Sequence, residues 1–167
     1  MCGFLFHNNK INPRVEESLI SRGRDYVSID KFENYKFQSF RLEVVGGDSG
    51  RQPYTYKNFK MIFNGEIYNY KDLSAKYFLS DKAARSDGEC ALELIVEYGD
   101  QRFFQEAVGH YAILIINIET SDVVFFRDEM GVKPLFYTPN ATGGFAVSSD
   151  INTLSSNYFF FRFLTIN

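Results

Sequence analysis

Short segments in which hydrophobic and polar residues alternate recur along the chain, and they predict a sheet-rich core. Between residues 36 and 45, the apolar side chains of Phe40, Leu42 and Val44 alternate with polar ones, which is the period of a half-buried strand. Further apolar runs predict strands at residues 2–6, 58–63, 111–118, 123–127, 135–137 and 145–148. The Asn64-Gly65-Glu66 segment directly follows one of these runs and predicts a sharp turn that presents backbone amides.

Helical spacing of apolar residues is found mainly in the middle of the chain. We expect helices at residues 71–77 and 87–98, and one or two helical turns at residues 15–20. Ser86 or Asp87 is the expected N-cap of the longest helix, and Gly99 is its expected end. The order of strands, then helices, then strands predicts a mixed α+β domain with largely antiparallel sheets.

Composition narrows the class of protein. The 167 residues suffice for one domain with a substantial core, and the 18 Phe and 11 Tyr suit a sheet-rich fold. A net charge of −3 without a basic run gives no reason to expect a nucleic-acid or membrane partner. The sequence shows neither an apolar stretch of membrane-spanning length nor a secretory signal. We therefore expect a cytoplasmic protein with reduced thiols.

The side chains that carry reactive groups are few. Two cysteines are too few for a disulfide framework or a metal site, so we expect no metal and no cofactor. Cys90 lies on the apolar side of its predicted helix, which favours a buried structural thiol. For His7 and His110, a structural or surface position is favoured over partnership with a catalytic cysteine.

Cys2 differs from the other cysteine because of its position. Removal of Met1, which is efficient before a small residue, leaves one residue with both a thiol and a free α-amine. That amine has a reference pKa of about 7.7 to 8.0, so part of it is neutral at cytosolic pH and able to act as a general base. One residue then supplies nucleophile and base, and no histidine is required.

Several motifs accompany Cys2 in a fixed order. After Met1-Cys2-Gly3 come residues 22–25 (RGRD), 41–42 (RL), 52–54 (QPY), 64–69 (NGEIYN), 86–89 (SDGE), 109–112 (GHYA), 127–137 (RDEMGVKPLFY) and 149–150 (SD). Together they resemble the glutaminase domain of the asparagine synthetase family, class II glutamine amidotransferases of the N-terminal-nucleophile hydrolase superfamily. The resemblance extends from residue 2 to about residue 154, and the NGEIYN and RDxxGxKPL segments are specific to the asparagine synthetase branch.

This resemblance implies a single glutaminase domain over residues 1–167, folded as a four-layer αββα sandwich with two antiparallel sheets. It implies that the domain hydrolyses L-glutamine to glutamate and ammonia through a thioester on an N-terminal cysteine. It also assigns roles by position, with Cys2 as nucleophile and the Asn64 side chain and the Gly65 backbone N–H as the oxyanion hole. The implied substrate-binding residues are Arg41 for the α-carboxylate, Asp87 with Glu66 for the α-ammonium group, and Leu42 and Val44.

The sequence departs from the family pattern at several positions. Arg24 stands where the family usually has proline, in a loop that helps to cover the glutamine pocket. Ser39, Glu43 and Asp150 also replace the usual residues. None of these changes removes a group that contacts substrate, so we expect a competent site with altered glutamine affinity or loop closure.

The partner and two alternatives are left open by the sequence. It contains neither the pyrophosphatase loop of the family's synthetase domain nor a Walker-type P-loop, so the expected partner is an ATP-dependent synthetase subunit or C-terminal domain. The apolar segment 158–164 either completes the core or docks on that partner. A degenerate glutaminase-like binding or regulatory module is one alternative, against which the presence of Cys2 argues. An N-terminal-nucleophile hydrolase of another amide is the second, against which Arg41 with Asp87 argues.

Overall fold

The computed structural model describes residues 2–8, 10, 13, 15, 17–42, 50–77, 86–139, 141–155 and 162–163, with the backbone alone for residues 155, 162 and 163. The strands are β1 (Gly3–Asn8), β2 (Tyr26–Phe32), β3 (Tyr35–Arg41), β4 (Tyr54–Tyr56), β5 (Phe59–Ile67), β6 (Gly109–Asn117), β7 (Val123–Arg127), β8 (Phe136–Pro139), β9 (Phe145–Ser148) and β10 (Arg162–Phe163). The helices are α1 (Glu17–Ile20), α2 (Tyr70–Tyr77), α3 (Asp87–Tyr98), α4 (Asp100–Glu106) and α5 (Ile151–Ser155).

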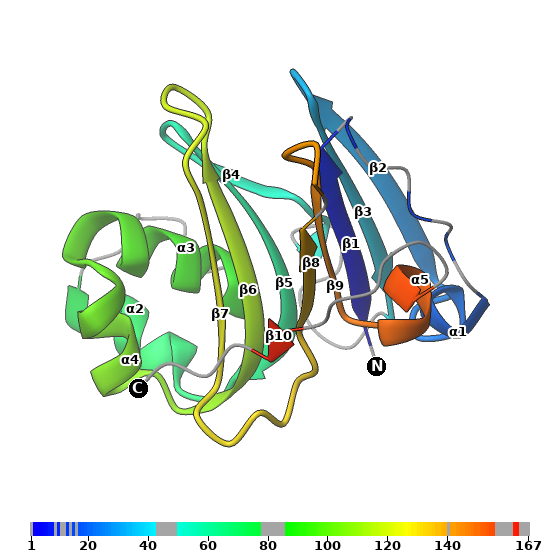
Figure 1. Ribbon diagram of the computed structural model, residues 1–167. Coiled ribbons are helices and arrows are strands. Elements are labelled where there is room, and N and C mark those ends of the chain that lie inside the picture. The colour runs from blue at the N-terminus through cyan, green and yellow to red at the C-terminus, as the bar shows by residue number, and fades with distance from the viewer. Residues whose placement is uncertain are drawn as a thin grey trace.

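Two antiparallel sheets face each other at the centre of the molecule (Figure 1). One sheet has the strand order β10-β8-β9-β1-β3-β2, and the other has the order β4-β5-β6-β7. Helices α2, α3 and α4 cover the outer face of the second sheet, while α1 and α5 lie on the outer side of the first (Figure 1). This arrangement confirms the expected α+β sandwich with two antiparallel sheets.

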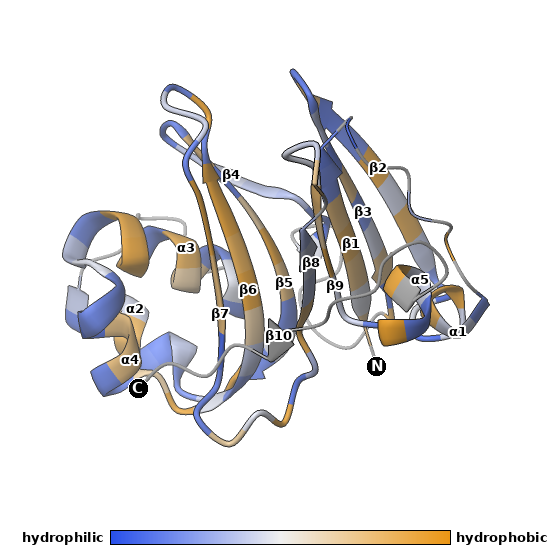
Figure 2. Ribbon diagram, in the orientation of Figure 1, coloured by the Kyte–Doolittle hydropathy of each residue, from blue (hydrophilic) through white to orange (hydrophobic). Residues whose placement is uncertain are grey.

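Apolar residues fill the space between the layers, which is why the central strands carry near-continuous hydrophobic runs (Figure 2). Phe4 and Phe6 of β1 point between the sheets and belong to one buried cluster with Ile62 of β5 and Leu114 of β6. Leu5, between them in sequence, points the other way and packs with residues of α1 and α5. A second cluster joins the outer face of β5 and β6 to α3 and α4. Both faces of these strands are therefore buried, and their ends are held firmly in place.

Most predicted elements are found where the sequence placed them. Helix α3 and strands β7 and β9 have the predicted bounds, and Ser86 is the N-cap of α3, because its side chain accepts a hydrogen bond from the Glu89 N–H. The strands β2, β4 and β10 and the helices α4 and α5 were not predicted. In β2 the apolar residues Val27 and Ile29 are 47% and 58% exposed, so its hydrophobic pattern does not mark a buried face.

The sharp turn predicted at residues 64–66 is wrong. Strand β5 runs on to Ile67, and Asn64, Gly65 and Glu66 pair with Ala112, Tyr111 and His110 of β6. The strand continues because β6 continues beside it and supplies ladder partners for each of these residues. A β-carbon on Gly65 would lie 2.3 Å from the His110 carbonyl oxygen, so glycine serves close strand approach here and not a turn.

The apolar segment 158–164 lies mostly outside the described residues. Within it, the backbone of Arg162 and Phe163 forms β10 and pairs with Tyr137 and Phe136 of β8. No helix in the part of the chain that the structure describes has the length and apolar character needed to cross a membrane.

Candidate active site

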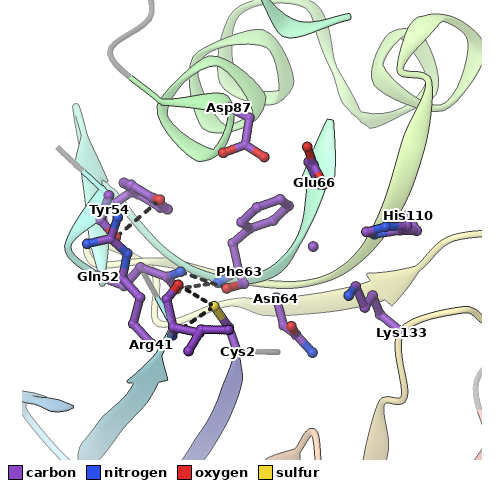
Figure 3. Close-up of a pocket in the computed structure, with 13 residues that line it drawn as sticks. Cys2, Arg41, Gln52, Tyr54, Phe63, Asn64, Glu66, Asp87, His110 and Lys133 are labelled. Carbon is purple, nitrogen blue, oxygen red and sulfur yellow. Dashed lines mark hydrogen bonds between the residues drawn. The ribbon is translucent and has the colours of Figure 1, made fainter. Parts of the chain in front are cut away.

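A cavity of about 120 Å³ opens where the ends of the two sheets meet the start of α3 (Figure 3). The residues that line it are Cys2, Arg41, Leu42, Gly50, Gln52, Tyr54, Phe63, Asn64, Gly65, Glu66, Asp87, His110 and Lys133. The fold thus brings together every site residue that the sequence predicted except Val44, which lies outside the described residues. These side chains come from segments that are far apart in sequence.

The Cys2 thiol lies at the mouth of this cavity, immediately before β1. Pairing of Gly3 with Phe40 places Cys2 beside the end of β3. There Sγ accepts a hydrogen bond from the Leu42 N–H at 3.4 Å and lies 3.5 Å from the Leu42 carbonyl oxygen, to which the thiol donates. The half-buried sulfur is thereby held against the backbone of the residue that follows Arg41.

Arg41 ends β3 with its guanidinium group buried against backbone, and the residue is only 7% exposed. A β-carbon on Gly50 would lie 2.3 Å from Arg41 Nη2 and 2.6 Å from Cζ. On the other side, a β-carbon on Gly23 would lie 2.2 Å from the carbonyl group of Phe40. Two glycines are therefore required for the chain to close around this arginine.

Asp87 occupies the first turn of α3, where its carboxylate is held by backbone donors. Oδ2 accepts a hydrogen bond from the Ile67 N–H at 3.0 Å, and Oδ1 accepts one from the Gly88 N–H at 3.0 Å. Burial raises the pKa of this carboxyl above its ordinary value. Hydrogen bonds from the backbone, including those of Ile67 and Gly88, oppose the rise, and the charge of Glu66 adds to it. The group is thus a buried carboxylate for which a cationic ligand is a favourable neighbour.

Tyr54 closes the cavity beside this helix terminus. Its ring leaves no space for a side chain at Gly88, where a β-carbon would lie 2.3 Å from Tyr54 Cε2. The hydroxyl donates to the Gly50 carbonyl oxygen at 3.5 Å, and burial raises the pKa of the phenol above its ordinary value. Tyr54 therefore stays neutral and links the Gly50 segment to α3.

Asn64 and Gly65 form the floor of the cavity on β5. Asn64 is almost fully buried, and its Nδ2 lies 3.5 Å from Ser149 Oγ. Its Oδ1 is buried without a hydrogen-bond partner among the described residues. The Asn64 amide is therefore buried with one of its two ends left without a hydrogen bond, which requires an explanation.

Gln52 connects the two sheets at the back of the cavity. Its side-chain amide pairs with both backbone groups of Phe63, with Nε2 donating to the carbonyl at 2.7 Å and Oε1 accepting from the N–H at 2.6 Å. Its backbone carbonyl accepts a hydrogen bond from Ser28 Oγ of β2 at 2.6 Å. Gln52 thereby fixes the position of the residue next to Asn64.

Comparison with known proteins agrees with this arrangement. Residues 1–162 match the sequence profile of the family described as glutamine amidotransferase domain. The chain belongs to the glutamine amidotransferase domain family. Similar proteins include glutamine-hydrolyzing asparagine synthetase 2 of Bacillus subtilis (strain 168), 31% identical over 83% of this chain and 20% of that protein. The glutamine-hydrolyzing asparagine synthetases of Homo sapiens and Zea mays are 30% and 28% identical, over 80% and 86% of this chain and 25% of each relative.

The chain spans a fifth to a quarter of the length of these relatives. These relatives agree with the resemblance that the motifs carry, including its asparagine synthetase branch.

Six residues that line the cavity were not predicted as site residues: Gly50, Gln52, Tyr54, Phe63, His110 and Lys133. Four of them, Gln52, Tyr54, His110 and Lys133, lie within motifs that carried the family resemblance, and this was the signal that could have found them. His7 is buried and contacts the Asn8 carbonyl, as expected of a structural histidine. His110 departs from that expectation, because it faces the cavity and its buried Nδ1 has no partner among the described residues.

Lys133 reaches the cavity because Asp128 organises the preceding loop. The Asp128 carboxylate accepts hydrogen bonds from the Val132 N–H at 2.9 Å, the Lys133 N–H at 3.2 Å and the Tyr111 N–H at 3.2 Å. The second cysteine, Cys90, is buried as predicted, and burial raises the pKa of its thiol to about 12. Within the described ranges, the His, Cys, Asp and Glu side chains form no group of three that could hold a metal ion.

Proposed function

We propose that this domain hydrolyses the side-chain amide of L-glutamine to glutamate and ammonia, with Cys2 as the nucleophile. The observation that carries the proposal is the convergence in one cavity of a thiol, a side-chain amide, a buried guanidinium and a buried carboxylate. The thiol can attack the amide carbon, the side-chain amide can stabilise the charge that develops, and the guanidinium and carboxylate can bind the charged ends of an amino acid. The relatives are named as glutamine-hydrolyzing asparagine synthetases, which supports the same substrate.

The proposed reaction proceeds through a thioester. Once Met1 has been removed, the α-amine of Cys2 takes the thiol proton, and the sulfur attacks the amide carbon of glutamine. The tetrahedral intermediate collapses when the amine returns the proton to the leaving nitrogen, which releases ammonia. Water then attacks the thioester with the amine again acting as base, and glutamate leaves with the thiol restored.

Asn64 and Gly65 supply the proposed oxyanion hole. Negative charge develops on the former amide oxygen only during attack, so donors fixed in place beforehand stabilise the transition state more than the substrate. The Asn64 side chain and the Gly65 N–H lie on the same stretch of β5 at the floor of the cavity. Because β5 is paired with β6 through these residues, their positions require little rearrangement.

Recognition of glutamine as a free amino acid falls to opposite charges. Arg41 is placed to pair with the α-carboxylate, for which its planar donors are suited, and Asp87 with Glu66 to pair with the α-ammonium group. The backbone of Leu42 completes the wall beside the thiol. Asparagine, shorter by one methylene, does not reach the thiol while both charged ends are held.

We further propose that the ammonia is passed to an acceptor that an ATP-dependent synthetase activates, either in a separate subunit or in another part of the polypeptide. The synthetase names of the relatives, of which this chain spans a fifth to a quarter, support this. A thiol nucleophile needs a reducing environment, which the cytoplasm provides. In this proposal residues 1–167 act as a single glutaminase domain.

The experiment is an assay of ammonia release from L-glutamine and, separately, from L-asparagine, with glutamate and aspartate as the respective products. The chain lacking Met1 should hydrolyse glutamine in strong preference to asparagine, and Cys2→Ala should abolish turnover. Cys90→Ala is the matched control, because it removes the other thiol without touching the cavity, and it should retain activity. Hydrolysis that survives Cys2→Ala, or equal turnover of asparagine, would overturn the proposal.

A further inference from the structure

Ser149 connects the strand that follows Cys2 to the side chain of Asn64. It is fully buried directly after β9, and its backbone N–H donates to the Phe4 carbonyl at 3.0 Å. Its Oγ accepts a hydrogen bond from the Phe4 N–H at 3.2 Å, and Asn64 Nδ2 lies 3.5 Å from the same oxygen. Phe4 and Asn64 belong to different sheets, so one hydroxyl group contacts both.

The orientation of the Asn64 amide leaves hydrogen-bonding groups unused. Ser149 Oγ acts as acceptor toward both Phe4 and Asn64, while Asn64 Oδ1 is buried without a donor among the described residues. The nitrogen points away from the Cys2 thiol (Figure 3). In that orientation the amide hydrogens are directed away from the place where an oxyanion would form.

Rotation of the amide by 180° about its Cβ–Cγ bond gives Oδ1 a hydrogen-bond donor and turns the Nδ2 hydrogens toward the cavity. The two ends of a primary amide are nearly equal in shape, so the hydrogen bonds around it decide its orientation. After the rotation, the Ser149 hydroxyl donates its single proton to Asn64 Oδ1 while still accepting from the Phe4 N–H. The Nδ2 hydrogens then face the cavity, where an oxyanion is the acceptor that pairs with them.

We propose that Ser149 is a positioning residue, whose hydroxyl donates to Asn64 Oδ1 and so directs the Asn64 Nδ2 group toward Cys2. The inference rests on the proposed function, because it concerns the oxyanion hole of that reaction. Ser149 itself does not contact the substrate and transfers no proton. Because the Ser149 hydroxyl also accepts a hydrogen bond from Phe4 of β1, it holds the strand that follows Cys2 at a fixed distance from Asn64.

Neighbouring Ser148 provides a matched control. Its hydroxyl is also fully buried and also contacts β1, donating to the Phe4 carbonyl at 3.2 Å and accepting from the Asp150 N–H at 3.0 Å. In the part of the chain that the structure describes, the Ser148 hydroxyl makes no hydrogen bond with Asn64. Loss of this hydroxyl tests the effect of removing a buried serine from the same strand end, without changing the orientation of the amide.

The kinetic test compares Ser149→Ala, Ser148→Ala, Asn64→Ala and the Ser149→Ala/Asn64→Ala double variant. Ser149→Ala should lower kcat for glutamine about tenfold or more and leave KM within about twofold, because the amide acts only on the transition state. The double variant should be no slower than Asn64→Ala, since the serine acts through the asparagine. Ser148→Ala should keep kcat near that of the unmodified chain. Effects of Ser149→Ala and Asn64→Ala that multiply independently, or a change in KM alone, would overturn the proposal.

Neutron diffraction from deuterated crystals of the unmodified protein tests the same claim without an assay. A deuteron on Ser149 Oγ directed at Asn64 Oδ1, with the ND₂ group facing the cavity, is the expected result. An ND₂ group directed at Ser149 would overturn the proposal. The two failures are distinguishable, since a chain that does not hydrolyse glutamine but shows the expected deuterons contradicts the proposed function and leaves the positioning role standing.

Discussion

At the scale of the residue, the site depends on charged side chains that are buried by the fold and hydrogen-bonded in part by the backbone. Asp87 shows this most clearly, because burial raises the pKa of its carboxyl while backbone N–H groups, including those of Ile67 and Gly88, oppose the rise. The folded state holds the Asp87 proton more tightly than the unfolded state does. Ionisation of Asp87 therefore lowers stability as the pH rises through the raised pKa, and a bound ammonium group offsets that cost.

The raised pKa of Asp87 predicts that glutamine binding depends on pH. In the Cys2→Ala background, which binds without turnover, glutamine affinity should fall as the pH is lowered toward that pKa, because a protonated carboxyl no longer attracts the α-ammonium group. Isothermal titration at a series of pH values measures this. Asp87→Asn should bind more weakly and lose the dependence. A dependence that persists in Asp87→Asn would assign it to another group, of which the half-buried Glu66 in the same cavity is the nearest candidate.

Substitution by alanine should have different consequences at Gly50 and at Gly99. Gly50→Ala should raise KM for glutamine about tenfold or more, because its β-carbon would displace the Arg41 guanidinium, 2.3 Å away. Gly99→Ala places its β-carbon in open space, but at a φ of +88° and ψ of 158° it should lower stability by roughly 1–3 kcal/mol and leave KM unchanged. Steady-state kinetics and thermal denaturation separate the two. A raised KM in Gly99→Ala would contradict this account of both glycines.

At the scale of the element, the sequence predicts the bounds of a helix or strand well where several local signals agree. Helix α3 has a capping serine, apolar residues at helical spacing and a terminal glycine, and its bounds are those predicted. The Asn64–Gly65–Glu66 segment was misread as a turn, since asparagine followed by glycine usually marks one. What extends the strand there is pairing with β6, more than 40 residues later in the chain, and no local pattern reports such a partner.

The same reasoning explains which site residues could be predicted. Cys2, Arg41, Asn64 and Asp87 were assigned through the family motifs, and the fold brings them to one cavity. Gln52 and Ser149 act through hydrogen bonds to residues 11 and 85 positions away. Both residues lie in family motifs, which could have marked their positions. Their contacts depend on how the two sheets pack, and no local pattern in the sequence reports them.

Gln52 is predicted to hold β5 in position through its paired hydrogen bonds to Phe63. Gln52→Ala should lower the free energy of unfolding by roughly 1–3 kcal/mol per buried backbone group left unpaired. It should also lower kcat, because Asn64 is the next residue on the strand. Chemical denaturation and steady-state kinetics check these expectations. The comparison variant is Ser28→Ala, which removes only the contact to the Gln52 carbonyl and should have a smaller effect on both. A larger effect of Ser28→Ala would contradict the role assigned to the side-chain amide.

At the scale of the whole molecule, the site is divided between the two sheets. Cys2 immediately precedes β1 and Arg41 ends β3 in one sheet, Asn64 and Gly65 belong to β5 in the other, and α3 contributes Asp87. The aromatic core between the sheets, in which Phe4 and Phe6 are fully buried, keeps these two halves in register. A ligand held at both ends therefore bridges the two layers of the sandwich.

We predict that a synthetase partner accelerates glutamine hydrolysis by ordering the loop that contains Arg24. Arg24 stands where the family usually has proline, next to Gly23, which packs on the Phe40 carbonyl beside the site. Docking that orders this loop would lower the cost of closing the pocket. Glutamate release should therefore rise when an ATP-dependent synthetase that co-purifies with the chain, ATP and the acceptor are added together. Arg24→Pro should raise basal release and reduce the stimulation. Release that is unchanged by such a partner would indicate a self-sufficient glutaminase.

The central claim is that Cys2, with its free α-amine, carries the glutamyl group during turnover. Its most direct test is intact-mass analysis of the protein quenched in acid while it hydrolyses glutamine. The account predicts a species that lacks Met1 and is heavier by one glutamyl group, with the addition located at Cys2 by peptide mapping and absent from Cys90, whose thiol pKa is raised to about 12. Glutamate release by a chain that retains Met1, or an acyl group carried by any residue other than Cys2, would contradict it.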